Sequence, residues 1–157
     1  MPDNAIMHAR DSIHGSLAKC FVTIEGRRYN FMNLTEFESV FAVNISEVPI
    51  LGKVGMGHKA AGSNGTWSGT AHYNQSHMRK IADKYNKTGV MPYFEIQVTN
   101  EDPTSTIGRQ TVIHHDCLCD SFVLAKFAAG QEVLTEDLSG TFDDFDLPET
   151  FSELEGV

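Results

Sequence analysis

The sequence of 157 residues contains only three cysteines and no long hydrophobic run. An odd number of cysteines, with Cys117 and Cys119 only two positions apart, fits reduced thiols better than a disulfide framework. No apolar stretch approaches the roughly 18 residues of a membrane-spanning helix, and residues 1–4 lack a basic region followed by an apolar one. We therefore expect a protein that is made in the cytosol, without a signal peptide or a membrane span.

Basic residues are also scarce. The chain has 12 Lys and Arg against 21 Asp and Glu, which gives a net charge of −9 with neutral histidines. Lys and Arg provide much of a protein's affinity for nucleic acid, because they displace counterions from phosphates. The charge balance therefore argues against a DNA-binding surface and against binding to an anionic membrane. The length predicts one domain spanning residues 1–157.

Two segments lack charge of one sign altogether. Residues 48–82 contain no Asp or Glu but include Lys53, Lys59, Arg79 and Lys80. Residues 127–157 contain no Lys or Arg and nine acidic residues. The simplest interpretation of the second segment is a solvated acidic surface. The alternative is that the basic middle and the acidic end are complementary surfaces through which identical subunits associate head to tail.

Apolar and polar residues alternate with a period of two along most of the chain, which is typical of β-strands. The clearest case is 93–99, where Phe94, Ile96 and Val98 alternate with polar residues. The same pattern predicts strands at 18–24, 36–48, 67–73, 109–115, 121–127, 132–138 and 140–145, with a weak one at 30–33. We expect a mainly β fold, with about eight strands in a sandwich or barrel and one helix packed on it.

The helix is predicted from apolar residues at the i, i+3, i+4 and i+7 spacing of an amphipathic helix: Met78, Ile81, Ala82 and Tyr85. Asn74 or Ser76 can cap its start, and Gly89 can supply the left-handed residue that ends it. Two other segments show neither the period of two of a strand nor the spacing of an amphipathic helix. Residues 52–65 contain five glycines, and residues 100–108 are polar and rich in turn residues. We expect both to be long loops, of the kind that is usually functional or disordered.

The strongest cluster of metal-binding residue types is 114–119, with the sequence His-His-Asp-Cys-Leu-Cys, and His72 and His77 are further candidates. Alternation along a strand would place His115, Cys117 and Cys119 on one face, but a structural zinc site usually pairs a Cys-x2–4-Cys element with a second one. Half-buried strand residues are the favoured interpretation. The glycine-rich segment lacks the Ser or Thr of a P-loop, and no Gly-x-Ser-x-Gly motif is present. We expect no catalytic, cofactor or metal site.

Ordered short motifs from Ile50-Leu51-Gly52-Lys53 onward resemble the PBSX-like phage tail tube proteins, which form the inner tube of contractile phage tails and of tail-like bacteriocins. They extend through about two thirds of the chain. The matching segments are 57–59 (Gly-His-Lys), 66–70 (Thr-Trp-Ser-Gly-Thr), 73–74, 87–89, 92–98 (Pro-Tyr-Phe-Glu-Ile-Gln-Val), 100–103, 108–112, 120–121, 124–127 and 141–145.

The resemblance implies a β-sandwich-like tail tube subunit with one helix. It also implies that six subunits join their sheets into a ring around an inner β-barrel, and that rings stack into a hollow tube for DNA or ions. The implied partners are further copies of the chain, a tail sheath protein outside the tube, and baseplate or terminator proteins at its ends. We expect the loop at 52–65 to contact the adjacent ring through Lys53, His58 and Lys59.

A channel that DNA passes through should carry few Lys and Arg residues on its wall. The polar strand faces that meet this condition supply candidate lumen residues: Glu36, Glu38, Ser68, Thr70, Glu95 and Gln97. The acidic end supplies residues for either subunit contacts or the lumen: Glu136, Asp137, Asp143 and Asp144. Two alternatives stay open, namely a ring-forming tail adaptor, baseplate or secretion-tube protein, and a small metal-dependent enzyme that uses the 114–119 cluster.

Overall fold

The structure is a computed structural model that describes residues 7–30 and 33–154. The weak strand predicted at 30–33 lies partly outside the described residues. A short 3₁₀ helix (Ala9–Asp11) precedes eight strands and one α-helix. In chain order these are β1 (Ala18–Ile24), β2 (Arg27–Asn30), β3 (Leu34–Val48), β4 (Gly57–His72), α1 (His77–Thr88), β5 (Phe94–Glu101), β6 (Arg109–Ser121), β7 (Thr135–Phe142) and β8 (Asp144–Glu149).

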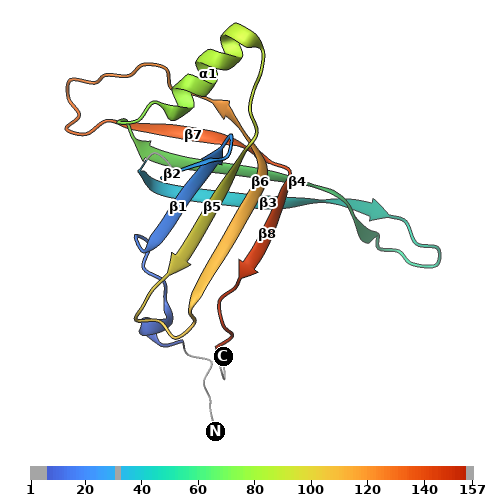
Figure 1. The fold of residues 1–157 in the computed structure, drawn as a ribbon. Helices are drawn as coiled ribbons and strands as arrows, with labels where there is room; N and C mark the ends of the chain where they lie inside the picture. Colours follow the sequence, from blue (N-terminus) through green and yellow to red (C-terminus); the bar gives the residue numbers. More distant parts are fainter. Residues whose placement is uncertain (1–6, 31–32, 155–157) are drawn as a thin grey trace.

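The strands form two antiparallel sheets that cross one another (Figure 1). Sheet A has the strand order β2-β1-β5-β6-β8, and sheet B has the order β3-β4-β7 with the end of β6 beside β7. The strand β6 belongs to both sheets, because residues 109–117 pair with β5 and residues 118–121 pair with β7. This shared strand joins the two layers. The expectation of a mainly β fold with one packed helix is confirmed.

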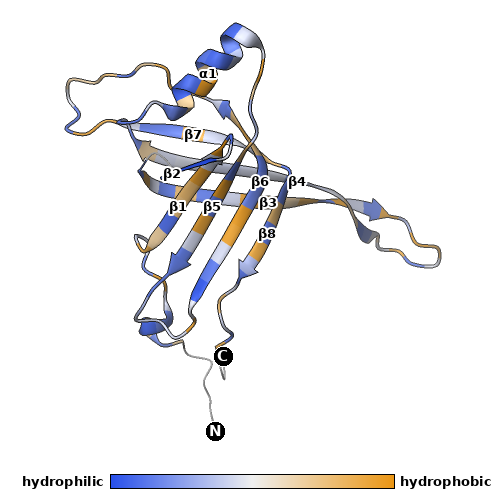
Figure 2. Ribbon diagram, in the orientation of Figure 1, coloured by the Kyte–Doolittle hydropathy of each residue, from blue (hydrophilic) through white to orange (hydrophobic). Residues whose placement is uncertain are grey.

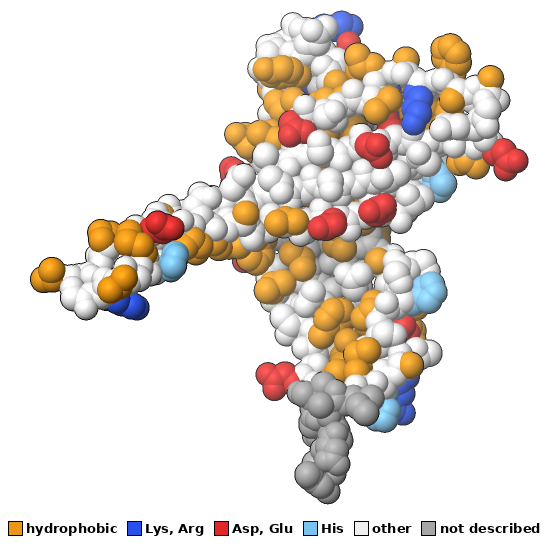
Figure 3. All heavy atoms as spheres, turned by 180° about the vertical axis from the view of Figure 1, so that it is seen from behind, with side chains coloured by type: hydrophobic (Ala, Val, Ile, Leu, Met, Phe, Trp, Pro, Cys, Tyr) orange, Lys and Arg blue, Asp and Glu red, His pale blue; other side chains and the backbone are white. Residues whose placement is uncertain are grey.

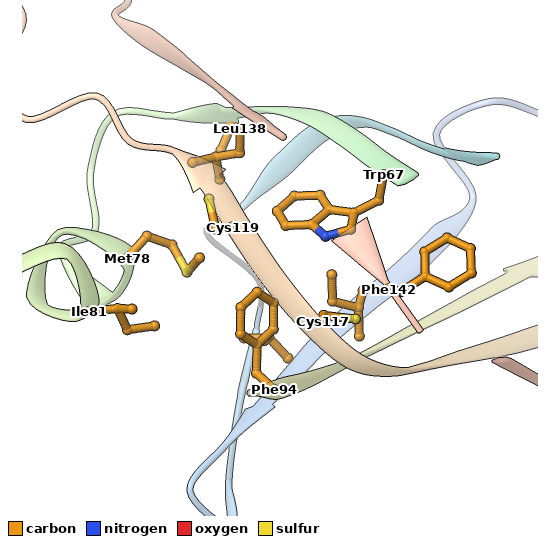
Figure 4. Packing of buried hydrophobic residues seen from close by; sticks show 11 residues of the cluster. Trp67, Met78, Ile81, Phe94, Cys117, Cys119, Leu138 and Phe142 are labelled. Atoms are coloured by element: carbon orange, nitrogen blue, oxygen red, sulfur yellow. The ribbon is translucent and has the colours of Figure 1, made fainter. Parts of the chain in front are cut away.

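The hydrophobic core fills the space between the sheets, and α1 closes one end of it (Figure 4). Trp67 of β4, Phe94 of β5 and Phe142 of β7 are each at most 5% exposed. Met78 and Ile81 bring the apolar face of α1 to the same cluster. The apolar residues that alternate along 93–99 thus face the core, since Phe94 and Ile96 of β5 are buried. Ser76 lies at the helix N-cap without a side-chain cap bond, and Gly89 ends the helix with φ 73°.

The alternation predicted for 114–119 is wrong, because β6 contains a bulge. Asp116 has φ 54°, and the pairing of β6 with β5 shifts register at this point. An extra residue in a strand reverses the faces of all residues after it. His114 and Cys117 are consequently both buried, while His115 between them points to the other face.

The prediction of one loop over 52–65 is also wrong in its second half. Residues 57–64 belong to β4 and pair with β3, from Val48 opposite Gly57 to Ala42 opposite Asn64. These glycine-rich residues form a strand because β3 supplies a long partner, and Gly62, with φ 133°, accommodates the irregularity in the ladder. Residues 42–64 form a hairpin arm that projects from the body of the subunit (Figure 1), and we call this segment the arm.

The strand predicted at 121–127 is absent from the described structure, where β6 ends at Ser121 and residues 122–134 are irregular. The Val123 carbonyl accepts a hydrogen bond from the Arg79 guanidinium of α1 instead of joining a ladder. Two strands are present where 132–138 and 140–145 were predicted, but the boundary between them is shifted: β7 continues through Phe142 and β8 begins at Asp144, so a single residue, Asp143, separates them. The remaining predicted strands are present with longer or slightly shifted ends.

The turn between β5 and β6 is ordered by hydrogen bonds within the turn and by contacts with segments near both ends of the chain. Asp102 accepts hydrogen bonds from the Thr104 backbone and hydroxyl, at 3.0 and 2.7 Å. Asp11 accepts equivalent bonds from Thr106, at 3.1 and 2.7 Å, and these bonds hold the pKa of Asp11 below its usual value. The Ser152 N–H donates to the Ile107 carbonyl at 2.7 Å. The loop predicted at 100–108 is therefore shorter than expected, because β5 extends to Glu101, and hydrogen bonds hold it in place.

Gly140 of β7 lies opposite Cys119, where β6 crosses to sheet B. A substitution at Gly140 therefore tests this crossing directly. A Cβ at this position would lie 1.8 Å from the Leu118 carbonyl oxygen. We predict that Gly140→Ala lowers the free energy of unfolding by about 1–3 kcal/mol, because the backbone of β6 must move to admit the methyl group. Urea unfolding of the soluble subunit measures this change. Gly130→Ala is the control, since no heavy atom lies within 4 Å of its Cβ, and an equal loss in both variants would contradict the crossing.

Candidate assembly surfaces

The arm exposes hydrophobic side chains on a large scale. Leu51 and Val54 at its tip are 103% and 105% exposed, which means that they contact nothing else in the subunit. Further exposed hydrophobic residues follow along the arm: Val43, Ile45, Val48, Ile50 and Met56. Hydrophobic residues recur up to the turn that joins its two strands (Figure 2). A protruding apolar hairpin of this kind marks an interaction site or an aggregation hazard.

The three predicted stacking residues all lie on the arm and are exposed. Lys53 is in the turn, and His58 and Lys59 are on β4 opposite Glu47 and Ser46 of β3. The arm thus carries two lysines and one histidine but a single acidic residue, Glu47. The arm combines an apolar surface with a basic character.

A polar face covers the solvent side of sheet B. The strand register places Glu36, Thr70 and Asp137 in one row, and Glu38, Ser68 and Ser139 in the next. These six residues, which we call the polar face of sheet B, line a groove of about 300 Å³. The Thr70 hydroxyl donates to Asp137 at 3.0 Å. None of the described residues that line the two grooves over this face is Lys or Arg.

Figure 3 shows this side of the molecule, where Asp and Glu side chains lie among uncharged ones. Four of the six candidate lumen residues therefore share one surface, together with Asp137 from the acidic segment. The other two, Glu95 and Gln97, lie on β5 in sheet A and do not join them. The sequence alone could not separate the two sets, because each strand alternates in the same way.

Glu95 instead belongs to a charged cluster on sheet A. The two ring nitrogens of His115 each face a carboxylate, Nδ1 at 3.0 Å from Glu95 and Nε2 at 2.8 Å from Asp146. Both ring nitrogens donate only when the imidazole is protonated. The hydrogen bond to Asp146, followed by the one to Glu95, accordingly raises the pKa of His115. Asp144 lies opposite His115 on the neighbouring strand, and Asp143 occupies the turn before it.

Glu136 differs from the other acidic residues of its segment, because its side chain is buried. Its carboxylate lies 2.7 Å from the Arg79 guanidinium, and the two side chains are 1% and 18% exposed. Arg79 also donates to the Val123 carbonyl and lies 4.4 Å from the centre of the Tyr73 ring. Glu136 therefore attaches α1 to β7 and is unavailable for a contact with another subunit or for a channel wall. Sequence spacing gave no sign of this pairing.

The 114–119 cluster contributes to the core. His114 donates from Nδ1 to the Ile96 carbonyl at 3.0 Å and accepts at Nε2 from the Ser39 hydroxyl at 2.9 Å. Burial lowers the pKa of His114, and burial raises the pKa of Cys117 to about 12. Within residues 7–30 and 33–154, no three His, Cys, Asp or Glu side chains form a group that could hold a metal ion. In the same residues, no helix has the length and apolar character needed to cross a membrane.

A feature that sequence reasoning missed is the irregular segment 122–134. Phe127 is 93% exposed, and Leu124 and Val133 are 69% and 61% exposed. The segment projects from the side of the body opposite to the arm (Figure 1). The alternation of apolar residues in this segment predicts a strand. In the structure the strand pairing ends at Ser121, and the residues that follow form an exposed apolar loop.

Comparisons with known proteins found a matching family and solved chains of similar fold. The model of a family described as phage tail tube protein matches residues 5–149. The chain is 33% identical over 147 residues to the phage-like element PBSX protein XkdM of Bacillus subtilis strain 168, covering 94% of this chain and 97% of the relative.

Two solved assemblies contain chains of similar fold. A chain of the anti-feeding prophage baseplate has a TM-score of 0.62 at 13% identity, covering 94% of this chain and 97% of that one. A chain of the PVC extracellular contractile injection system, in its extended sheath–tube complex, has a TM-score of 0.63 at 9% identity, with coverages of 84% and 89%.

The His115 cluster predicts a pH-dependent contribution to stability. A raised pKa in the folded state means that the imidazolium–carboxylate contacts stabilise the subunit fully below the ordinary pKa of about 6.5, and that this stabilisation is lost as pH rises through the raised value. We predict that His115→Gln destabilises the subunit at acidic pH and has little effect at alkaline pH. Urea unfolding of both proteins across pH measures the difference. A difference that grows with pH would contradict the cluster.

Proposed function

The chain belongs to the phage tail tube protein family, and from this premise we propose that it is a structural subunit of the inner tube of a contractile tail or tail-like particle. In this proposal six copies form a ring, and rings stack into a hollow tube that conducts DNA or ions. A sheath protein surrounds the tube, and baseplate and terminator proteins bind its ends. We further propose that residues 1–157 act as one domain without catalytic activity, made in the bacterial cytoplasm and assembled into the particle.

The arm is the observation that carries the proposal. It presents seven exposed hydrophobic residues on a hairpin whose outer part packs against no other element of the described subunit. Burial of one such side chain contributes about 1.5–3 kcal/mol, so several of them offset the entropy lost on association. The strand β3, which is 15 residues long, pairs with β4 on one side only, and its other edge has no strand partner in the described structure. A neighbouring copy that covers both features removes an exposed edge that an isolated β domain must otherwise protect.

The polar face of sheet B suits the wall of the channel. Its three carboxylates, Glu36, Glu38 and Asp137, repel phosphates, and its remaining polar groups form hydrogen bonds without attracting them. We assign Glu36, Glu38, Ser68 and Thr70 to the lumen on this ground. Glu95 and Gln97 belong to sheet A and are assigned to the opposite, outward side of the subunit.

Two lysines test the arm. In the proposal Lys53 and Lys59 meet acidic residues of the adjacent ring. We predict that Lys53→Glu combined with Lys59→Glu abolishes long tubes, because like charges would then face one another at each stacking contact. Negative-stain electron microscopy of the purified protein measures tube length. The control is Lys80→Glu with Lys87→Glu on α1, which changes the net charge equally, and normal tubes from the arm variant would contradict the stacking role.

The lumen assignment is tested by adding positive charge to each sheet in turn. We predict that tubes of Glu36→Lys/Glu38→Lys, assembled with a single-stranded DNA oligonucleotide, retain it in a salt-dependent manner and protect it from nuclease. Wild-type tubes should retain none. Tubes of the sheet A variant Glu95→Lys/Gln97→Lys should bind the oligonucleotide on the outside, where nuclease digests it. Protection by the second variant alone would place sheet A on the channel and contradict the assignment.

The same preparations separate this proposal from a ring-forming adaptor. A tube protein polymerises into long tubes, whereas an adaptor or terminator stops at one ring. Single rings under all conditions would therefore favour the adaptor.

A further inference from the structure

Sheet A ends in two open edges on opposite sides (Figure 1). Among the described residues, β2 pairs only with β1, and β8 pairs only with β6. Each of the two strands therefore has one side whose backbone groups and side chains are available to a neighbour. Open edges of this kind pair readily with other chains unless something covers them.

The β2 edge is basic. Arg27 and Arg28 are both exposed, and neither takes part in an ion pair within the described residues. The Arg28 guanidinium lies 4.0 Å from the centre of the Phe21 ring, and that of Arg27 lies 5.5 Å from the Tyr29 ring. A guanidinium on an aromatic face is held in place while its N–H groups still point outward. Neighbouring residues of a strand point to opposite faces, so Arg28 lies on the face of Glu95 and His115, and Arg27 lies on the other face with Tyr29.

The β8 edge is acidic. Asp144 and Asp146 lie two residues apart on the strand and therefore point to the same face, and the Asp146 side chain is 68% exposed. Only one oxygen of Asp146 contacts His115. Pro148 has no N–H to donate to a further strand, so contacts at this edge depend more on side chains than on a backbone ladder.

We propose that, within a ring, the β2 edge of one subunit lies against the β8 edge of the next, with Arg28 contacting Asp144 and Asp146 and with Arg27 adding to the positive charge of the β2 edge. This inference rests on the proposed function, and it specifies which surfaces of sheet A meet and in which direction. A two-fold contact through either edge would bring like charges together, arginines against arginines or aspartates against aspartates. A head-to-tail contact brings opposite charges together and uses both edges of every subunit, as a closed ring requires.

Charge reversal at one edge and then at both edges tests the contact. The first variant is Arg27→Glu/Arg28→Glu, and the second is Asp144→Arg/Asp146→Arg. We expect each to raise the protein concentration needed for assembly by about tenfold or more, because both edges then carry the same sign. The third variant contains all four substitutions and should assemble close to the wild-type concentration, since the two edges are again complementary. Light scattering and electron microscopy measure assembly, and circular dichroism checks folding.

An equimolar mixture of the first two variants gives an independent readout. Subunits with two acidic edges and subunits with two basic edges can alternate around a ring with an even number of positions, so mixing should restore assembly that neither variant shows alone. The milder pair Arg27→Gln/Arg28→Gln and Asp144→Asn/Asp146→Asn should weaken assembly in the same direction if a reversal impairs folding. Lys80→Glu/Lys87→Glu on α1 is the control for the change in net charge of the Arg27→Glu/Arg28→Glu variant.

Two results would overturn the proposed contact. One is assembly of both reversed variants at the wild-type concentration. The other is failure of the folded four-substitution variant and of the mixture to recover assembly. Either result with wild-type tubes still present rejects this contact and leaves the proposed function standing. Absence of tubes from the wild-type protein rejects the proposed function itself.

Discussion

The crossing of two sheets that share β6 is the constraint on which the rest of the structure depends. The bulge at Asp116 allows one strand to turn its buried face from sheet A to sheet B. After the bulge, Cys117 and Cys119 join Trp67 and Phe142 in the common core. The same crossing fixes the opposite surfaces, because each sheet then has one buried face and one face toward solvent. The polar face of sheet B and the His115 cluster of sheet A are consequently held on opposite sides of the subunit.

A core of this design leaves no room for the apolar residues of the arm and of segment 122–134. Both project from the body, on opposite sides, and their most exposed side chains contact almost nothing. In the proposed tube, neighbouring copies of the chain bury these residues. The proposed assembly thus uses the surfaces that folding of the subunit leaves exposed, and it agrees with the phage tail tube protein family to which the chain belongs.

The elements with strict local periodicity could be predicted from the sequence. Strand β5 and helix α1 are examples, because the inward residues of each repeat at a single spacing. Features that depend on partners distant in sequence could not be predicted. The glycines of β4 form a strand only because β3 extends alongside them, and residues 121–127 alternate without any strand to pair with. Glu136 contributes to the acidic sum of its segment but is neutralised by Arg79, 57 positions away in sequence. The candidate lumen residues lie on two different sheets, and this division too depends on strand pairing between residues distant in sequence.

The most direct test of the account is a cryo-electron microscopy reconstruction of the tubes that the purified chain forms. The account predicts a hollow tube of stacked six-membered rings, with β3, β4 and β7 around the channel and the arm of each subunit buried against a neighbouring copy. A channel lined by sheet A, or an arm left in solvent, would contradict it.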